Sequence, residues 1–331
     1  MYIAGRPWKS MKEIQDRINE ISEALTEAEY VIIGAGAGLS TASGIEYGGK
    51  RFKENFSDYI KKYNMTDMYT AGFYPFKTLE EKWGYWSKHI FLNCVNMPST
   101  PLYEKLYDLV RDKNFFVITT NVDEQFRKSG FPMDKVHAIQ GSYNLLQCSR
   151  PCHDKLYDNT NTIINMVENI DENLKIPTEL IPTCPKCGNP MENNLRADDK
   201  FVEDKNWHKQ NHAYEKFLEE AKDHETVLLE FGVGYNTPGI IRFPFDFLTT
   251  QQEKWTLVRF NRSHLELGLN YHKTIKLLSV EAIDKYNLPN NMNKRYIPVS
   301  EDIEMVIDEL LKKRIKTNVE YVNYEKNKNY M

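Results

Sequence analysis

Four of the five cysteines in this chain form two close pairs, and thiolates at such spacings are typical zinc ligands. Cys148 and Cys152 are separated by three residues, whereas Cys184 and Cys187 are separated by two within a Cys-Pro-Lys-Cys-Gly turn. Four thiolates predict a closed, structural tetrahedral zinc site that takes no part in catalysis. The alternative is two unrelated pairs of reduced thiols. The remaining cysteine, Cys94, is expected in the core.

A second set of residues could hold a phosphate group. Gly34, Gly36 and Gly38 follow the apolar run YVII at 30–33, and a helix is expected to start near Ser40–Ser43. Glycines at this place would let the backbone approach a pyrophosphate, which the amides at the start of the helix would face. The same glycine spacing also fits a simple tight turn.

Polar side chains follow another apolar run, FFVITT at 115–120. Asn121 and Asp123 come directly after it, which is where ligands bind to open α/β sheets. Amide and carboxylate groups suit ribose hydroxyls, a carboxamide and an ordered water. The alternative is that Asn121 caps a helix in the sequence DEQFRKSG.

The elements that would position these groups alternate along the chain. Strands are predicted for four runs rich in Val, Ile, Leu and Phe, at 30–33, 115–120, 226–234 and 255–261. Amphipathic helices are predicted after the capping-box pattern of Ser10 and Glu13, at 102–110 and at 301–313. This order predicts an α/β fold, a Rossmann-like parallel sheet with an inserted small zinc-ribbon and helical domain.

Two regions interrupt the alternation, so the Rossmann-like domain is expected to be discontinuous. The expected divisions are the Rossmann-like domain at 1–45, 101–145 and 226–313, a loop and helical module at 46–100, a zinc-ribbon domain at 146–225, and a flexible polar tail at 314–331.

Composition excludes several functional classes. The net charge of −4 gives no basic surface for nucleic acid or for an anionic membrane. No apolar run approaches the ~20 residues that a bilayer span needs, and the first residues lack the apolar core of a signal peptide. Four cysteines arranged for metal binding favour a reducing compartment, and we therefore expect a cytoplasmic protein.

Two longer segments make the chain resemble the sirtuin family. VIIGAGAGLSTASGI at 31–45 matches the family's G-A-G-x-S-x-x-S-G-I loop, and TTNVD at 119–123 matches its T-Q-N-I-D motif. The resemblance implies that Asn121 lies near the nicotinamide ribose of NAD and that Asp123 holds the carboxamide. It also implies NAD contacts from Gly36, Ala37, Gly38 and Ser40.

Other parts of the chain depart from the family pattern. Where sirtuins continue with P-D-F-R, this chain has EYGGKRF at 46–52, and Arg51 or Phe52 is expected to serve in place of the missing residues. The segment 232–234 stands where sirtuins have G-T-S, which removes two hydroxyl contacts. The further NAD contacts implied by the resemblance are Arg51, Phe52, Gly232, Val233, Gly234, Asn261, Asp302 and Ile303.

Gln140 stands where sirtuins carry the catalytic histidine of their His-Gly-Ser motif. That histidine deprotonates a ribose hydroxyl, and such base catalysis contributes about 10²–10⁴ in rate. A Gln amide can orient a ribose or a nucleophile, but it has no usable pKa. His137 lies ~10 Å away along an extended chain, which is too far to substitute in place. Asn121, Asp123 and Gln140 are therefore the predicted catalytic residues, orienting NAD and the nucleophile.

The substrate region also differs from that of sirtuins. The stretch 193–204 resembles the family's strand that pairs with a substrate peptide, with Phe201 and Val202 as its pairing surface, but its Pro and Gly-Glu are absent. With the deacylation half of the chemistry altered, ADP-ribosyl transfer to a protein would survive. Gln140 makes the chain similar to the bacterial macrodomain-linked (class M) sirtuins. That similarity implies a lipoylated acceptor related to the glycine-cleavage H protein, and a partner macrodomain hydrolase.

Three alternative functions are open at this point. The first is an NAD-dependent protein-lysine deacylase whose base is Asp123, His137 or the substrate. The second is an NAD hydrolase, in which water replaces the protein nucleophile. The third is a catalytically silent NAD-sensing module, against which the retained Asn121 and Asp123 argue.

Overall fold

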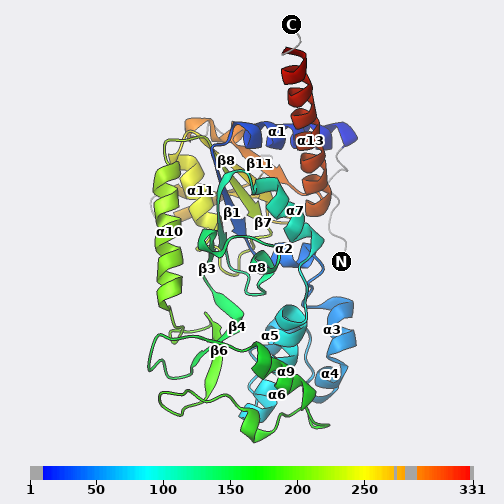
Figure 1. Ribbon diagram of the computed structural model, residues 1–331, viewed down its shortest axis with the longest axis vertical. Helices are drawn as coiled ribbons and strands as arrows, with labels where there is room; N and C mark the ends of the chain where they lie inside the picture. Colours follow the sequence, from blue (N-terminus) through cyan, green and yellow to red (C-terminus); the bar gives the residue numbers. More distant parts are fainter. Residues whose placement is uncertain (1–9, 272–273, 280–288, 329–331) are drawn as a thin grey trace. The chain divides into compact units, whose positions relative to one another are not determined.

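The computed structural model describes residues 10–271, 274–279 and 289–328 (Figure 1). The chain divides into two compact units, each formed from separate stretches of sequence. The first comprises Met1–Leu39, Glu104–Ile118 and Glu215–Met331, and the second comprises Ser40–Tyr103 and Thr119–Tyr214.

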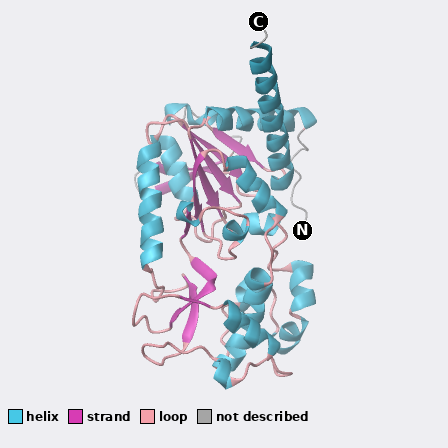
Figure 2. Cartoon of the chain, in the orientation of Figure 1, coloured by secondary structure: helices cyan, strands magenta, loops and turns pink. Residues whose placement is uncertain are grey.

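Five strands of a largely parallel sheet form the centre of the first unit, and all four predicted strands are among them (Figure 2). Their order is β11-β8-β7-β1-β2, and β11, β8, β7 and β1 pair in parallel. Every residue of β7 is buried, as expected for a sheet covered on both faces. The bounds are β1 (Tyr30–Ala35), β2 (Asn114–Thr119), β7 (Thr226–Phe231), β8 (Trp255–Phe260) and β11 (Tyr296–Val299).

Helices cover this sheet, and the predicted ones are present. Helix α1 (Met11–Glu27) begins with the predicted capping box of Ser10 and Glu13, and it packs against β11 and α13 (Ile303–Lys328). Helix α13 continues well past residue 313, where the sequence predicted its end. The remaining elements are α7 (Pro101–Val110), α10 (Lys205–Ala221), α11 (Arg242–Gln251), η4 (Pro289–Lys294) and the antiparallel pair β9 (Leu267–Tyr271) and β10 (Thr274–Leu278).

The second unit contains a helical module with an aromatic core. Phe52, Phe56, Tyr59 and Tyr85 are fully buried and stack or meet edge to face. Such ring contacts stabilise a module beyond the area that it buries. The helices are α3 (Gly49–Asn55), α4 (Ser57–Tyr63), α5 (Met68–Ala71), α6 (Leu79–Ile90), the π-helix η1 (Phe91–Val95) and α9 (Thr160–Glu168).

A three-stranded antiparallel sheet lies beside this module in the same unit, in the order β5-β4-β6. Gly141, the first residue of β4, has a φ of +88°, and a Cβ there would lie 2.0 Å from the carbonyl oxygen of Asn194. Only glycine permits this approach to β6. The bounds are β4 (Gly141–Cys148), β5 (Tyr157–Asp158) and β6 (Met191–Leu195), with the short elements β3 (Val136–Ala138), η2 (Met133–Lys135) and η3 (Thr178–Leu180) elsewhere in the chain.

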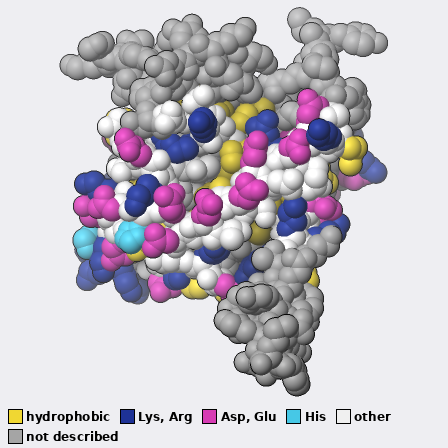
Figure 3. Space-filling view, turned by 90° about the horizontal axis from the view of Figure 1, so that it is seen from above, with side chains coloured by type: hydrophobic (Ala, Val, Ile, Leu, Met, Phe, Trp, Pro, Cys, Tyr) yellow, Lys and Arg dark blue, Asp and Glu magenta, His cyan; other side chains and the backbone are white. Residues whose placement is uncertain are grey.

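The visible surface carries charges of both signs. On the face drawn in Figure 3, Asp and Glu side chains alternate with Lys and Arg side chains. Such mixing agrees with the small net charge of −4. Among the helices of the described residues, none combines the length and the apolar character that crossing a bilayer requires.

Candidate functional site

In the first unit, the predicted glycine loop is built by contact between two turns. The turns that follow β1 and β7 meet backbone to backbone, and the amide of Gly38 donates to the carbonyl oxygen of Gly232 at 3.0 Å. A Cβ on Gly38 would lie 2.6 Å from the Cα of Gly232, and Gly232 itself has a φ of +58°. These glycines are therefore required by the packing of the two turns, a reason that the spacing alone did not reveal.

The helix after the glycine loop differs from the prediction. Helix α2 spans Ala37–Ala42, so it starts three residues before Ser40 and ends before Ser43. The helix begins early because the turn after β1 is complete at Gly36, whose carbonyl oxygen accepts from the amide of Leu39. Ser40 consequently lies within the helix, with its side chain directed to other polar groups.

Two further predicted contacts of the first unit are fixed by local hydrogen bonds. The side-chain amide of Asn261 donates to the carbonyl oxygen of Val233 at 3.0 Å, and its oxygen accepts from the amide of His264. Asn261 thus ties the 232–234 turn to the end of β8. Asp302 caps α13, because its carboxylate accepts from the amide of Met305.

Arg242 also supports the 232–234 turn, and the sequence reasoning missed it. This fully buried guanidinium donates to the carbonyl oxygens of Val233 and His264 and to the backbone oxygen of Glu266. A buried arginine at the start of α11 has no distinctive local spacing, so only the assembled fold reveals its role. It joins the segment after β7 to the segment between β8 and β9.

In the second unit, Asp123 is the end point of a buried chain of hydrogen bonds. Ser40 donates its hydroxyl proton to Oδ2 of Asp123 at 2.5 Å, so its oxygen can only accept from the hydroxyl of Tyr103, 3.1 Å away. The side-chain amide of Asn121 donates to that tyrosine oxygen at 3.1 Å. This chain of hydrogen bonds brings together three predicted site residues, Ser40, Asn121 and Asp123. It also includes Tyr103, which the sequence did not predict as a site residue.

The electrostatics of Asp123 are set by burial. Desolvation raises the pKa of this carboxyl group, while the hydrogen bonds from Ser40 and from the amide of Gln125 act in the opposite direction. The hydrogen bond from the backbone amide of Gln125 to Asp123 forms an Asx turn, which directly precedes α8 (Gln125–Lys128). The helix N-cap is Glu124, so the alternative that Asn121 caps this helix is not what the structure shows.

Gln140 lies in the turn between β3 and β4 and is half-buried. Its carbonyl oxygen accepts from the amide of Arg196 at 3.1 Å, while its side-chain amide makes no hydrogen bond within the part of the chain that the structure describes. His137 is fully buried in β3 against the ring of Trp207, and burial lowers its pKa to about 4. Because its ring is fully buried and its pKa is low, His137 is a poor replacement for the base that is missing at position 140.

The 46–52 loop is held by Arg51. Its guanidinium donates to the side-chain oxygen of Asn93 at 2.6 Å and to the carbonyl oxygens of Glu46 and Leu92 at 3.0 Å. Asn93 and Leu92 belong to η1, a π-helix of the kind often found at functional sites. Phe52 is buried in the aromatic core of the helical module.

The four paired cysteines come together as predicted. Their sulfur atoms all lie within 4.8 Å of one another, and the Cys148–Cys187 and Cys152–Cys184 distances are both 3.6 Å. Sulfurs around a tetrahedral zinc, with bonds of about 2.3 Å, lie roughly 3.8 Å apart. The cluster is therefore compatible with zinc. Cys94 is buried in the core as expected, and burial raises the pKa of its thiol to about 12.

The predicted substrate strand is absent at Phe201 and Val202, where the structure has no strand. The amide of Val202 donates to Oε1 of Gln147 at 3.0 Å, and its carbonyl oxygen accepts from the side chain of Asn194 at 3.0 Å. Both backbone groups of Val202 are thus satisfied within the chain. Phe201 instead lies 4.3 Å under the guanidinium of Arg196.

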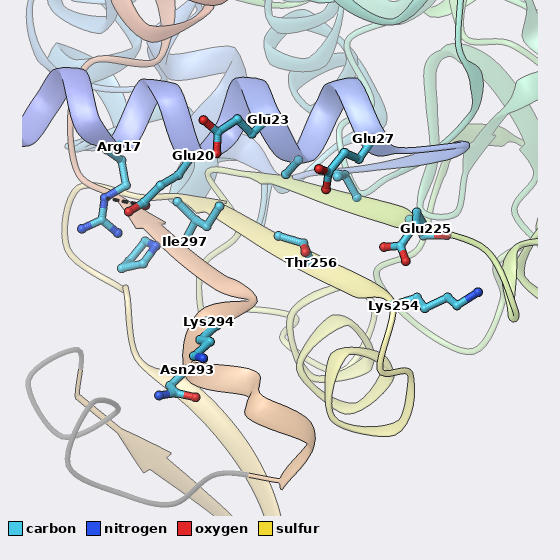
Figure 4. A pocket seen from close by; sticks show the side chains of 14 residues that line it. Arg17, Glu20, Glu23, Glu27, Glu225, Lys254, Thr256, Asn293, Lys294 and Ile297 are labelled. Atoms are coloured by element: carbon cyan, nitrogen blue, oxygen red, sulfur yellow. Dashed lines mark ion pairs between the residues drawn. The ribbon is translucent and has the colours of Figure 1, made fainter.

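A cavity of about 570 Å³ in the first unit is lined by none of these residues (Figure 4). It is formed by α1 and the amino-terminal parts of β7, β8 and β11. Its wall contains an ion pair between Arg17 and Glu20, 3.9 Å apart and drawn dashed in the figure. The glycine turns follow the carboxyl ends of β1 and β7, so this cavity lies at the opposite ends of the strands and is not the predicted cofactor site.

Comparison with known proteins identifies relatives along most of the chain. Residues 36–226 match the model of the Sir2 family. The chain is 36% identical over 310 residues to a protein ADP-ribosyltransferase of Staphylococcus aureus strain Mu50, covering 92% of this chain and 91% of that protein. It is 34% identical over 257 residues to a probable bifunctional ADP-ribose hydrolase/ADP-ribosyltransferase of Fusarium oxysporum f. sp. cubense, covering 72% of this chain and 41% of that protein.

The fold agrees with these relatives. A crystal structure of a Sir2 homologue in complex with NAD superposes with a TM-score of 0.54 and 15% identity, covering 90% of this chain and 94% of that one. At this identity the likeness concerns the fold alone, and it confirms the predicted Rossmann-like α/β architecture. The family match and the 36% identical relative together show that the chain belongs to the Sir2 family, the sirtuins.

Proposed function

We propose that this sirtuin is an NAD-dependent protein ADP-ribosyltransferase. The observation that carries the proposal is its 36% identity, over 92% of the chain, to a protein named for that activity. The position of Gln140 supports it, because a side chain without a usable pKa stands in the turn before Gly141 and Ser142.

The described residues fit NAD as the donor substrate. When bound, NAD supplies an ADP-ribosyl group, with nicotinamide as the leaving group. The turns of Gly36, Gly38 and Gly232 carry no side chains, so a pyrophosphate can approach the backbone there. Ala37, Ser40, Arg51, Phe52, Val233, Gly234, Asn261, Asp302 and Ile303 complete the proposed set of cofactor residues.

Asn121, Asp123 and Gln140 are the proposed catalytic residues. Asn121 is held by Tyr103, and Asp123 is held by Ser40, so both side chains are preorganised before the substrate arrives. Gln140 keeps its side-chain amide available to orient a ribose or the nucleophile. All three act by orientation, and the proposed acceptor supplies its own nucleophile.

The contacts of Val202 favour transfer over peptide deacylation. A peptide that adds to a strand needs free backbone amides and carbonyl groups, and those of Val202 already bond Gln147 and Asn194. His137, proposed as a relocated base in the deacylase alternative, is fully buried. The deacylase therefore lacks support for its substrate strand at Val202 and for His137 as its base, which leaves Asp123 or the substrate in that role.

For the acceptor we propose a lipoylated protein related to the glycine-cleavage H protein, with a macrodomain hydrolase as functional partner. The basis is the class M resemblance through Gln140. The name of the Fusarium relative joins an ADP-ribose hydrolase to an ADP-ribosyltransferase, which agrees with such a partnership. We propose a cytoplasmic location, because the four paired cysteines favour a reducing compartment. The net charge of −4 leads us to expect neither nucleic acid nor membrane as a partner.

We propose zinc as a structural metal held by the four paired cysteines. Purified protein is expected to contain one zinc per chain, and Cys184→Ser is expected to lose it together with a large part of the thermal stability. Cys94→Ala, which removes a buried thiol outside the cluster, is the matched control and should retain the metal. Equal zinc content in the two variants would contradict the assignment.

The transferase is tested by incubating the protein with labelled NAD, a lipoylated H-like protein and an acetyl-lysine peptide. We expect label on the acceptor and no deacetylation of the peptide. Deacetylation without labelling would favour the deacylase. Release of nicotinamide and free ADP-ribose alone would indicate an NAD hydrolase, and binding of NAD without turnover would indicate a sensing module.

A further inference from the structure

A chain of hydroxyl groups within the second unit has no role in the proposed function so far. The hydroxyl of Tyr47 lies 2.9 Å from that of Tyr143, which lies 2.9 Å from Nε2 of His89. Nδ1 of His89 lies 3.2 Å from the hydroxyl of Tyr85, which donates to the carbonyl oxygen of Met68 at 2.7 Å. Tyr143, His89 and Tyr85 are buried, and Tyr47 is the most exposed of these four hydrogen-bonded residues.

The inner end determines the direction of these hydrogen bonds. Tyr85 uses its single proton on a carbonyl oxygen, so its own oxygen must accept from Nδ1–H of His89. Burial, assisted by the charge of Arg51, lowers the pKa of His89 to about 3, and the ring is therefore neutral with a bare Nε2. Tyr143 consequently donates to Nε2, and its oxygen accepts the proton of Tyr47.

The outer end is therefore a hydrogen-bond acceptor. The proton of Tyr47 points inwards, which leaves the lone pairs of its oxygen for another group. Burial, and then the charge of Asp123, raise the pKa of Tyr47, so the hydroxyl stays neutral. Tyr143 links this chain of hydrogen bonds to the proposed catalytic residues, because its backbone amide donates to the carbonyl oxygen of Val122, between Asn121 and Asp123, at 2.9 Å. Tyr47 also belongs to the 46–52 loop, in which the chain departs from the sirtuin P-D-F-R pattern.

We propose that Tyr47 is a further ligand-binding residue, whose oxygen accepts a hydrogen bond from a donor in the nicotinamide riboside half of NAD. Tyr143 and His89 are positioning residues that fix the direction of that hydroxyl. The inference rests on the proposed use of NAD. The donor is a ribose hydroxyl or a carboxamide N–H, which present the same chemistry to an acceptor oxygen.

The test measures the affinity of the full-length protein for NAD and for ADP-ribose, which lacks nicotinamide. Tyr47→Phe and Tyr143→Phe should each weaken NAD binding about tenfold, the worth of one hydrogen bond. The double variant should be no weaker than either one, because both remove the same contact. Equal weakening for ADP-ribose identifies the ribose as donor, whereas an effect on NAD alone identifies the carboxamide.

A matched control is Tyr59→Phe, which removes another buried hydroxyl of the same module, bonded to the carbonyl oxygen of Gly84 and outside the chain. It should leave NAD affinity unchanged. Unchanged affinity in Tyr47→Phe, or additive losses in the double variant, would overturn the inference. ¹⁵N NMR of His89 in the unmodified protein adds a test that needs no variant, since a proton on Nε2 at pH 7 would overturn the inferred direction.

The outcomes also separate this inference from the proposed function. If Tyr47→Phe weakens NAD binding while the unmodified protein labels no acceptor, the inference stands and the transferase proposal fails. If the unmodified protein labels its acceptor and Tyr47→Phe binds NAD equally well, the transferase proposal stands and the inference fails.

Discussion

The glycine turns of the first unit and the polar cluster around Asp123 in the second are both proposed to bind NAD, yet they are built differently. The turns meet through backbone atoms, with Gly38 and Gly232 in direct contact and no side chain between them. The cluster consists of side chains joined by single hydrogen bonds, from Asn121 through Tyr103 and Ser40 to Asp123. A steric contact tolerates no added atom, whereas a hydrogen-bonded cluster loses function one bond at a time.

The largest effect is expected from Gly232→Val. The new side chain would need a left-handed backbone and would place its Cβ 2.4 Å from backbone atoms of Gly38, so we expect loss of NAD binding and about 3 kcal/mol of stability or more. Thermal unfolding and NAD titration measure both. The control is Gly239→Ala, because Gly239 has open space around it. Normal NAD binding by Gly232→Val would show that the turns do not interlock as described.

The next largest effect is expected from Asp123→Asn. The amide would present a donor where Ser40 or the amide of Gln125 now donates, and the loss of a charge-assisted hydrogen bond predicts about a 100-fold lower rate of ADP-ribosyl transfer. The rate is measured with labelled NAD. Asp134→Asn, at an exposed position outside the cluster, should behave like the unmodified protein. A rate within twofold would show that the cluster is not needed.

A smaller effect is expected from Gln140→Ala. Its side-chain amide makes no hydrogen bond within the described residues, so the variant should keep its thermal stability and lose about tenfold in transfer rate. Gln251→Ala, at an exposed helix end, is the control. Gln140→His restores a base, but it should gain no peptide deacetylation because the backbone of Val202 is already bonded. Efficient deacetylation by Gln140→His would instead show that residue 140 alone determines whether the protein acts as a deacylase.

The smallest effect concerns the response of stability to pH. The pKa of His89 is lowered to about 3 in the folded protein, against an ordinary value near 6.5, so the unfolded chain binds more protons in this interval. Its contribution to stability is complete above pH 6.5 and falls as the pH drops towards 3, by up to ~1.4 kcal/mol per unit. The difference between the unfolding free energies at pH 7 and pH 5 should therefore be smaller for His89→Gln than for the unmodified protein. An equal loss in both proteins would contradict a buried neutral His89.

Local patterns made much of the fold predictable. Apolar runs marked β1, β2, β7 and β8, and a capping box marked α1, because these signals lie within a few residues of one another. The cysteine cluster was equally readable, since its spacing is a property of short turns. Helix α2 began earlier than predicted, and α13 ended later, because helix ends depend on contacts that the sequence does not display.

The polar clusters were not predictable in the same way. Tyr47 and Tyr143 are 96 residues apart in the sequence, and Ser40 and Tyr103 are 63 apart, so no spacing rule connects them. Tyrosines with helical spacing in the aromatic-rich region also look like ordinary core residues. The prediction of a strand at Phe201 and Val202 was wrong for a related reason. The side chains of Gln147 and Asn194 form hydrogen bonds with the backbone of Val202, and the sequence near Val202 does not reveal them.

The contact between Gly38 and Gly232 also has a consequence for how the protein folds. The two residues are separated by about 190 positions, and closing so long a loop is slow because the entropy is lost before any contact is gained. The first glycine turn should therefore acquire its final shape late, after β7 has paired with β1. A growing chain that has not yet reached β7 already contains nearly all of the family-defining stretch, but it cannot yet hold this turn in place.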